Sequence, residues 1–185
     1  MRVLVVYYSE TKNTEKVAKA IYDEASKKHE ALLRKINEIT VDDLSDYDLV
    51  FLGSACHSAD LALPVKKFLK AVPKSPKFKL AGFFTHSCST QEGSRESFDT
   101  WVSKCVVSFE SVSKEKQIDF KGYYSCQGAP SPATQEFIRN EIFESADSTP
   151  ARTAWEEYVG EALKHPSPED LREAEEFARQ VMSNL

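Results

Sequence analysis

Residues 5–14 read VVYYSETKNT, a run of apolar and aromatic side chains that changes abruptly into hydroxyl and amide side chains. The apolar run belongs to a predicted strand over residues 2–8, and its unbroken hydrophobicity is typical of a strand covered on both faces. The residues after it predict a helix over residues 13–29. A buried strand that leads directly into a helix indicates an α/β domain with a parallel sheet.

The same alternation of strand and helix continues along the chain. Further strands are predicted over residues 32–36, 49–53, 79–85 and 118–126, with helices from residue 64, over about 96–112 and after residue 167. Ser131-Pro132 and Thr149-Pro150 each resemble a helix cap followed by a proline in the first turn, so two extra helices are expected. We therefore predict one domain over residues 1–185, with five parallel strands, helices on both faces and a helical insertion at about 127–165.

Composition limits the classes of partner and compartment. The net charge of −5 argues against a nucleic-acid partner, and no apolar run reaches the roughly 18 residues that a membrane span needs. The four cysteines are widely spaced and form no CxxC, so neither a zinc knuckle nor a disulfide scaffold is indicated. We expect a cytoplasmic protein with free thiols.

The turn at residues 9–14 is the first place to look for a ligand, because ligands of such sheets bind beyond the carboxyl ends of the strands. It presents hydroxyls and backbone N–H groups at a helix N-terminus, which favours an anion, and Lys12 adds a positive charge. An ordinary cap uses one such side chain, so a phosphate site is the favoured interpretation. The chain has neither GxGxxG nor GxxxxGK[ST], which excludes two common phosphate motifs.

The same turn resembles the phosphate-binding loop of the flavodoxin family, [S/T]-x-T-G-x-T, although Lys12 stands where that family usually has glycine. DYDLVFLGSACHS and GFFTHSCSTQEG resemble the family's two flavin loops with their strands, and HPSPEDLREAEEFARQV resembles its closing helix. The resemblance implies a flavodoxin-like three-layer sandwich with strand order 2-1-3-4-5 and non-covalently bound FMN. The phosphate-binding residues it implies are Ser9, Thr11, Lys12, Asn13 and Thr14, and the ring-binding residues are Ser54, Ala55, Cys56, His57, Thr85, His86, Ser87 and Cys88.

The resemblance further implies an electron-transfer protein that shuttles electrons between redox partner proteins and has no catalytic residues of its own. Two alternatives stay open, an FMN-dependent NAD(P)H reductase of a quinone or other small acceptor, and a flavin-free binding or scaffolding domain. A homodimer formed by the extra helices is also left open. Cys56, Cys88 and Cys126 are predicted at or just past the ends of three strands, where they either fill tight space or form a thiol pair or a metal site beside the cofactor.

Overall fold

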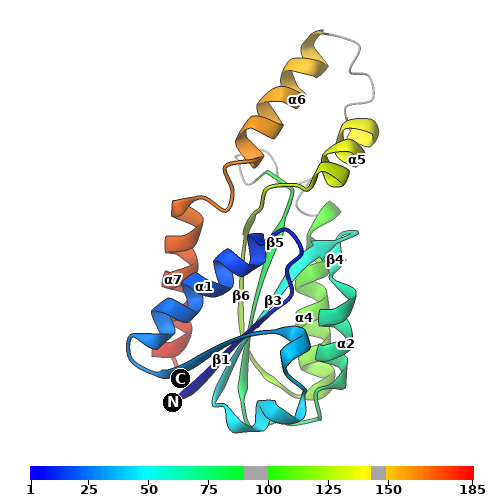
Figure 1. Cartoon of the computed structure of the whole chain (residues 1–185). Helices are drawn as coiled ribbons and strands as arrows, with labels where there is room; N and C mark the ends of the chain where they lie inside the picture. The colour runs from blue at the N-terminus through cyan, green and yellow to red at the C-terminus, as the bar shows by residue number, and fades with distance from the viewer. Residues whose placement is uncertain (90–99, 143–148) are drawn as a thin grey trace.

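Five parallel strands form the centre of the molecule in a computed structural model that describes residues 1–89, 100–142 and 149–185 (Figure 1). They are β1 (Arg2–Tyr7), β2 (Glu30–Lys35), β3 (Leu49–His57), β5 (Lys79–His86) and β6 (Asp119–Gln127). Their order is β2-β1-β3-β5-β6, and the short β4 (Asp60–Leu61) pairs antiparallel with β3 outside this path. Counted over the parallel strands, this is the predicted order 2-1-3-4-5, so the predicted fold class is confirmed.

Helices cover both faces of the sheet. α1 (Asn13–Ser26) and α7 (Pro168–Ser183) lie on one face, and α2 (Leu63–Ala71) and α4 (Ser103–Lys116) lie on the other (Figure 1). The side chains of β1 alternate between two cores: Val3 and Val5 pack on the α1 and α7 side, whereas Leu4 and Val6 pack on the α2 and α4 side. All four are fully buried. The uninterrupted apolar sequence of β1 follows from this two-sided burial.

Large aromatic side chains fill both cores. Phe51 and Phe83 lie in the core beneath α1 and α7, and Phe84 and Phe109 lie in the core beneath α2 and α4. Gly53 is needed in β3 because a Cβ at this position would come within 2.2 Å of the Phe83 ring. The close passage of this ring over the β3 backbone is possible only with glycine.

Two further helices, α5 (Pro132–Ile142) and α6 (Thr149–Ala162), stand beyond the carboxyl ends of the strands (Figure 1). The Ser131 hydroxyl accepts a hydrogen bond from the Thr134 N–H at 3.1 Å, as expected of the predicted cap. The Ala129 N–H donates to the His165 carbonyl at 2.9 Å, so the chain before α5 touches the chain after α6. In the described part of the chain, no helix has the length and apolar character to cross a membrane.

Several element boundaries differ from those predicted. β3 runs four residues past the predicted end because its last residues pair with β4. α1 ends at Ser26, before the predicted end at residue 29, and α4 continues to Lys116 beyond the predicted residue 112. The first residues of that predicted helix, 96–99, lie outside the described residues. The short 3-10 helices η1 (Ile36–Glu38) and η2 (Asp42–Asp46) were not predicted.

Candidate functional site

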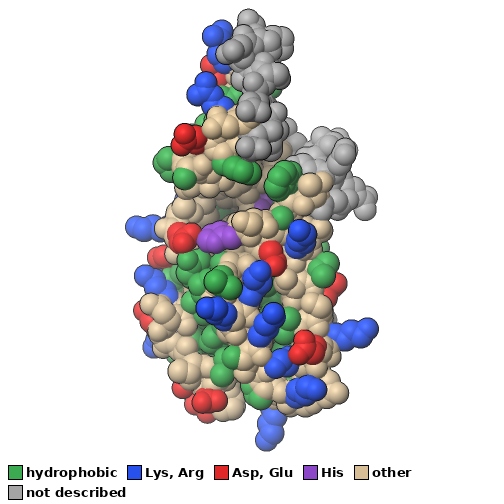
Figure 2. Space-filling view, turned by 90° about the vertical axis from the view of Figure 1, so that its right-hand side faces the viewer, with side chains coloured by type: hydrophobic (Ala, Val, Ile, Leu, Met, Phe, Trp, Pro, Cys, Tyr) green, Lys and Arg blue, Asp and Glu red, His purple; other side chains and the backbone are tan. Residues whose placement is uncertain are grey.

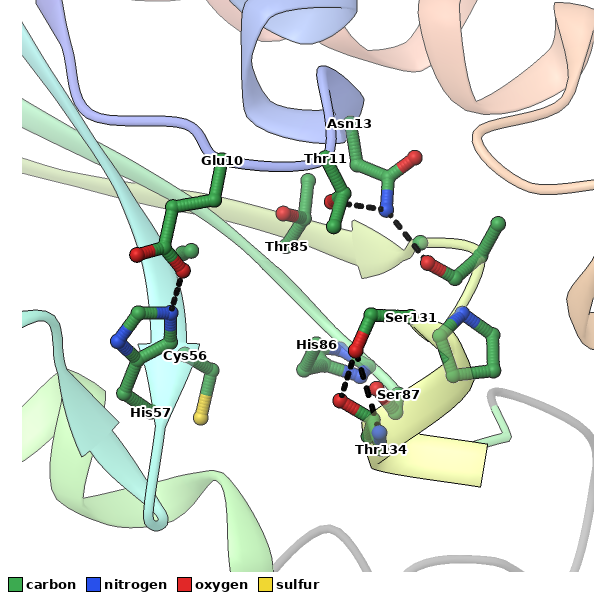
Figure 3. A pocket seen from close by; sticks show the side chains of 14 residues that line it. Glu10, Thr11, Asn13, Cys56, His57, Thr85, His86, Ser87, Ser131 and Thr134 are labelled. Carbon is green, nitrogen blue, oxygen red and sulfur yellow. Dashed lines mark hydrogen bonds and ion pairs between the residues drawn. The ribbon is translucent and has the colours of Figure 1, made fainter. Parts of the chain in front are cut away.

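A cavity of about 210 Å³ lies where the carboxyl ends of β1, β3, β5 and β6 meet the start of α5. In the space-filling view from the α2 and α4 side, the surface is hollowed between the body of the molecule and the part above it (Figure 2). Figure 3 shows the side chains that surround the cavity. Its lining residues are Glu10, Thr11, Asn13, Ala55, Cys56, His57, Thr85, His86, Ser87, Gly128, Ala129, Pro130, Ser131 and Thr134.

The turn before α1 forms one wall of this cavity. Lys12 occupies the N-cap position with φ 67°, a left-handed conformation, and gives the first turn no side-chain hydrogen bond. The usual glycine of the family pattern at this position is therefore explained, because glycine adopts positive φ without a Cβ clash. Asn13 donates through Nδ2 to the Thr11 hydroxyl at 3.0 Å and to the Ala129 carbonyl at 2.8 Å. The second bond joins the turn to the segment after β6.

Gly128 makes that junction possible. A Cβ at Gly128 would lie 2.9 Å from Asn13 Nδ2, closer than real Cβ atoms come to their neighbours. The Gly128 N–H donates to the His86 carbonyl at 2.8 Å, which also ties this segment to the end of β5. The start of α1, the end of β5 and the segment after β6 are thus held together around the cavity.

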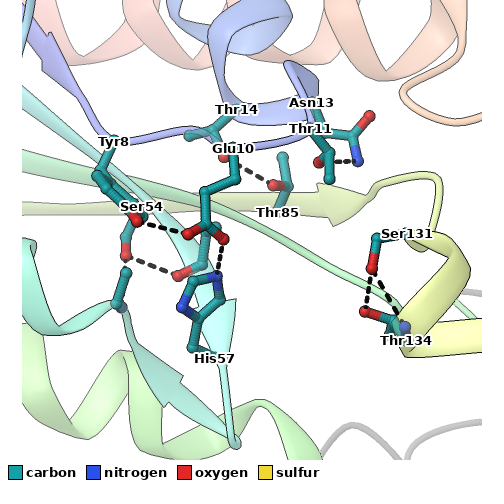
Figure 4. A network of polar contacts seen from close by, with 12 residues as sticks. Tyr8, Glu10, Thr11, Asn13, Thr14, Ser54, His57, Thr85, Ser131 and Thr134 are labelled. Atoms are coloured by element: carbon teal, nitrogen blue, oxygen red, sulfur yellow. Dashed lines mark hydrogen bonds and ion pairs between the residues drawn. The ribbon is translucent and has the colours of Figure 1, made fainter. Parts of the chain in front are cut away.

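Two of the predicted site residues serve as internal ties (Figure 4). Thr14 is fully buried, and its hydroxyl is 2.9 Å from the Thr85 hydroxyl, which connects α1 to β5. Ser54 is also fully buried, and its hydroxyl accepts the Ala62 N–H at 2.9 Å. Neither Thr14 nor Ser54 lines the cavity. Their side chains hold the walls in place.

The second wall is a hairpin formed by the end of β3 and β4. Its two turn residues, Ser58 and Ala59, have φ values of 50° and 67°, which corresponds to the primed turns that join two strands tightly. Asp60 fixes the hairpin by accepting hydrogen bonds from Lys66 Nζ at 2.7 Å and from the Ser108 hydroxyl at 2.6 Å. Burial opposes the charge of Asp60, but the bonds it accepts outweigh burial and lower its pKa.

A polar cluster links the two walls at the mouth of the cavity (Figure 4). The Glu10 carboxylate accepts the Tyr8 hydroxyl at 2.7 Å and lies 3.1 Å from His57 Nε2. The hydrogen bond to Glu10 raises the pKa of Tyr8. The rings of Tyr8 and His57 meet edge to face, with centroids 6.0 Å apart. Because these groups are exposed, the contact adds little stability, but it positions a carboxylate and an imidazole over the cavity.

The floor of the cavity is formed by the end of β5. His86 is 4% exposed, and burial lowers its pKa to about 4, so its imidazole is neutral near pH 7. The Tyr158 hydroxyl of α6 donates to the Ser87 carbonyl at 2.7 Å. The strand end is therefore covered by α6, and the cavity presents a neutral, hydrogen-bonding floor.

The structure brings most of the predicted site residues to this one cavity. Those that line it are Thr11, Asn13, Ala55, Cys56, His57, Thr85, His86 and Ser87. Ser9, Lys12 and Cys88 are partly or fully exposed nearby but do not line it, and Thr14 and Ser54 are buried behind it. Glu10, residues 128–131 and Thr134 also line the cavity but were not among the predicted FMN-binding residues. Gly128, two residues past the end of the predicted strand, was a usable signal, because ligands collect at strand ends.

Cys56, Cys88 and Cys126 lie at or just past the ends of β3, β5 and β6, as predicted, but they are divided between the two faces of the sheet. Cys56 and Cys88 pack against the core beneath α2 and α4, but Cys126 is buried in the core on the other face of the sheet. The Cys56 thiol donates to the Trp101 carbonyl at 3.5 Å, and Cys105 of α4 is buried in the same core. Among the described residues, no group of three or more histidine, cysteine or acidic side chains is arranged to hold a metal ion.

Comparisons with known proteins match almost the whole chain. A family model described as the flavodoxin domain matches residues 4–179. The flavodoxin-like domain-containing protein BilS of Clostridioides difficile is 28% identical over 185 residues, covering 98% of this chain and 97% of that protein. An uncharacterized protein of Methanocaldococcus jannaschii is 26% identical over 190 residues, and the match covers 100% of both chains. Oxidised flavodoxin 2 from Bacillus cereus has a similar structure, with a TM-score of 0.65 and 17% identity over 100% of both chains.

Proposed function

The chain belongs to the flavodoxin domain family, and from that premise we propose that it binds FMN in the cavity and carries electrons between redox partner proteins. FMN supplies the redox chemistry when it is bound. The residues of the chain bind the phosphate, position the ring and limit its access to water. The observation that carries the proposal is the start of α1, which faces this cavity without a side-chain cap.

The start of α1 fits a phosphate group. The first N–H groups of a helix have no acceptor within the helix, and here the residue at the N-cap position contributes no side chain to them. The helix dipole adds positive potential at the same place, and Thr11 lines the cavity with its hydroxyl. We assign the phosphate to the backbone N–H groups of this turn, that of Asn13 included, together with the side chains of Ser9, Thr11 and Lys12. The Asn13 side-chain amide already donates to Thr11 and Ala129. Thr14 contributes through its backbone, because its hydroxyl is already paired with Thr85.

The remaining walls fit the flavin ring. Ala55, Cys56 and His57 come from the hairpin, and Thr85, His86 and Ser87 come from the end of β5. The volume of about 210 Å³ is below the roughly 300–1,000 Å³ of a typical ligand pocket. We therefore expect bound FMN to extend out of the cavity. An exposed edge suits an electron carrier, because electrons then reach a partner without the release of FMN.

A titration of the flavin-free chain with FMN and with riboflavin tests the phosphate assignment. We expect FMN to bind at least tenfold more tightly, because riboflavin lacks the group that the α1 N-terminus would hold. Thr11→Ala removes a hydroxyl hydrogen bond to a charged group, worth about 1.5–3 kcal/mol, and should weaken FMN by about tenfold or more while leaving riboflavin unchanged. Thr40→Ala is the matched control, since Thr40 bonds to Asp43 and does not line the cavity. Equal affinity for both flavins would refute the assignment.

Addition of NADPH to the FMN-loaded chain distinguishes a carrier from a reductase. A carrier keeps its oxidised flavin absorbance with NADPH alone and loses it only when a reduced partner protein is supplied. Rapid bleaching by NADPH, recovered on adding a quinone, would overturn the carrier assignment and support the reductase. No flavin binding at all would support a scaffolding domain.

A further inference from the structure

The segment from the hairpin to the end of β5 carries a charge opposite to that of the chain as a whole. Residues 61–86 contain six lysines and no aspartate, glutamate or arginine, whereas the whole chain has a net charge of −5. Figure 2, which views the α2 and α4 side, shows Lys and Arg side chains gathered there with hydrophobic side chains between them. A local basic surface is therefore built into an acidic protein.

One face of α2 presents part of this surface to solvent. Leu63, Lys67 and Lys70 are spaced by four and three residues, so they lie along the same face of the helix. All three are exposed, and Leu63 is 58% exposed although it is apolar. Among the described residues, Lys67 and Lys70 have no acidic partner, unlike Lys66, whose Nζ lies 2.7 Å from Asp60. The charges of Lys67 and Lys70 are thus available to a partner.

α4 extends the surface to the edge of the cavity. The Ser108 hydroxyl donates to Asp60 at 2.6 Å, which ties α4 to the hairpin. Lys104 is exposed and lies on the same side of α4, four residues before Ser108. Trp101 is 40% exposed, and its carbonyl accepts the thiol of Cys56, a cavity-lining residue. We call this surface the α2–α4 face, and it consists of Leu63, Lys67, Lys70, Trp101 and Lys104.

The α2–α4 face lies close to the proposed flavin site. α2 begins two residues after β4, the second strand of the hairpin wall. Because a helix rises about 1.5 Å per residue, Lys70 lies only about 11 Å along the helix axis from Leu63. A protein seated on this face would therefore meet the edge of an FMN that extends out of the cavity.

We propose that the α2–α4 face docks a redox protein whose own docking surface is acidic, an inference that rests on the proposed function. The lysines pair with carboxylates of the partner, and Leu63 and Trp101 provide the apolar centre of the contact. An exposed tryptophan and leucine among charged side chains are typical of a protein interface. A nucleic acid is held mainly by contacts to its phosphates and leaves such apolar side chains without a role.

The distribution of charge also orients the partner. The remainder of the chain has an excess of acidic residues and repels an acidic protein, whereas the α2–α4 face attracts it. Encounters are therefore directed to the face beside the cavity. Attraction of this kind acts mainly on the association rate and weakens as the salt concentration rises.

Binding of an acidic plant-type ferredoxin to the ¹⁵N-labelled, flavin-free chain tests the docking by nuclear magnetic resonance. At about 20 mM salt we expect changes at the amides of residues 63–70 and 101–108, and binding at least tenfold weaker at about 500 mM salt. Lys67→Glu combined with Lys70→Glu should weaken binding at low salt by at least tenfold. Lys19→Glu combined with Lys28→Glu is the matched control, because these exposed lysines lie in α1 and the turn after it and the change in net charge is the same.

Several outcomes would overturn the proposal. They are equal losses of affinity in the two double variants, amide changes confined to other surfaces, or tighter binding of duplex DNA or phosphatidylserine vesicles than of ferredoxin at the same salt. Leu63→Ser should weaken binding at both salt concentrations, and an unchanged affinity would remove the apolar centre from the account. Because this binding needs no flavin, a failure of FMN binding would leave the result valid. FMN-loaded double variants that accept electrons from reduced ferredoxin equally fast would refute the docking and leave the carrier assignment standing.

Discussion

Replacing His86 by glutamine should remove a large part of the pH dependence of stability. In the folded chain His86 has a pKa of about 4, lowered first by burial, whereas its usual value is 6.5. A hydrogen bond with the Cys88 backbone favours the charged form but does not compensate for burial. As the pH falls below 6.5, His86 becomes protonated in the unfolded chain but stays neutral in the folded chain. The contribution of neutral His86 to the free energy of unfolding is therefore fully present above pH 6.5 and is lost as the pH falls from 6.5 to about 4.

The size of the effect follows from the two pKa values. Each pH unit between them changes the free energy of unfolding by about 1.36 kcal/mol for a single group. Lowering the pH from 6.5 to 5 should thus cost the wild type about 2 kcal/mol through His86 alone. Other groups titrate as well, so the quantity of interest is the difference in slope between the wild type and His86→Gln.

Urea unfolding of the flavin-free chains at several pH values between 7.5 and 5 measures this difference. His86→Gln is expected to lower stability at neutral pH, because its amide is buried, but to lose about 2 kcal/mol less than the wild type on acidification. His29→Gln is the control: burial also lowers the pKa of His29, but this side chain is only partly buried and should account for less of the slope. Parallel pH profiles for the wild type and His86→Gln would refute the reasoning.

The remaining predictions concern substitutions at Lys12, Glu24 and Gly128, with Lys12→Ala and Gly160→Ala as controls. Lys12→Gly relieves a left-handed conformation at φ 67° and should raise the free energy of unfolding by about 1 kcal/mol, whereas Lys12→Ala, which keeps the Cβ, should not. Glu24→Gln weakens the hydrogen bonds that Glu24 accepts from Arg179 at 3.0 Å and from Lys27 at 2.6 Å. These bonds lower the pKa of Glu24, so they stabilise the fold only while Glu24 is ionised. The variant should therefore melt at a lower temperature than the wild type at neutral pH, and this difference should shrink below pH 4.5. Gly128→Ala places a Cβ 2.9 Å from the Asn13 amide and should destabilise the chain by about 1–3 kcal/mol in urea unfolding and weaken FMN binding. Gly160→Ala, in open space on a helix, should stabilise it slightly, and the reverse order of these two alanine variants would contradict the proposed close approach.

The junction of β1 and α1 could be predicted because its determinants are local. An unbroken apolar run specifies a strand buried on both faces, and the hydroxyl-rich turn marks the start of a helix. Lys12 stood out in the sequence because it replaced an expected glycine, and the structure gives the reason in its positive φ. The predicted sheet order followed from the family resemblance and is confirmed.

The β3–β4 hairpin could not be predicted from local preferences. Its turn residues Ser58 and Ala59 have positive φ, yet neither belongs to the Asn-Gly or Asp-Gly pairs that usually indicate such a turn. The conformation is fixed by Asp60, through partners in α2 and α4 that lie well beyond the turn. The hydrogen bond from Asn13 to Ala129 joins residues 116 positions apart in the sequence, and no periodic pattern of residues predicts it.

The cysteine positions show how strand register decides contacts that sequence position alone leaves ambiguous. Ala55, Thr85 and Cys126 stand opposite one another across β3, β5 and β6. Since successive side chains of a strand point to opposite faces, Cys56 and Cys126 face different cores although each lies one residue before the end of its strand.

Nuclear magnetic resonance of the ¹⁵N-labelled, flavin-free chain tests the central claim most directly. The backbone amides of residues 11–15 are followed while FMN is added, and then while riboflavin is added to a second sample. A phosphate held by the start of α1 should shift these amides strongly with FMN and leave them nearly unchanged with riboflavin. Amides of the hairpin and of the β5 end should respond to both flavins. Equal responses of residues 11–15 to both flavins, or no response to FMN, would contradict the account.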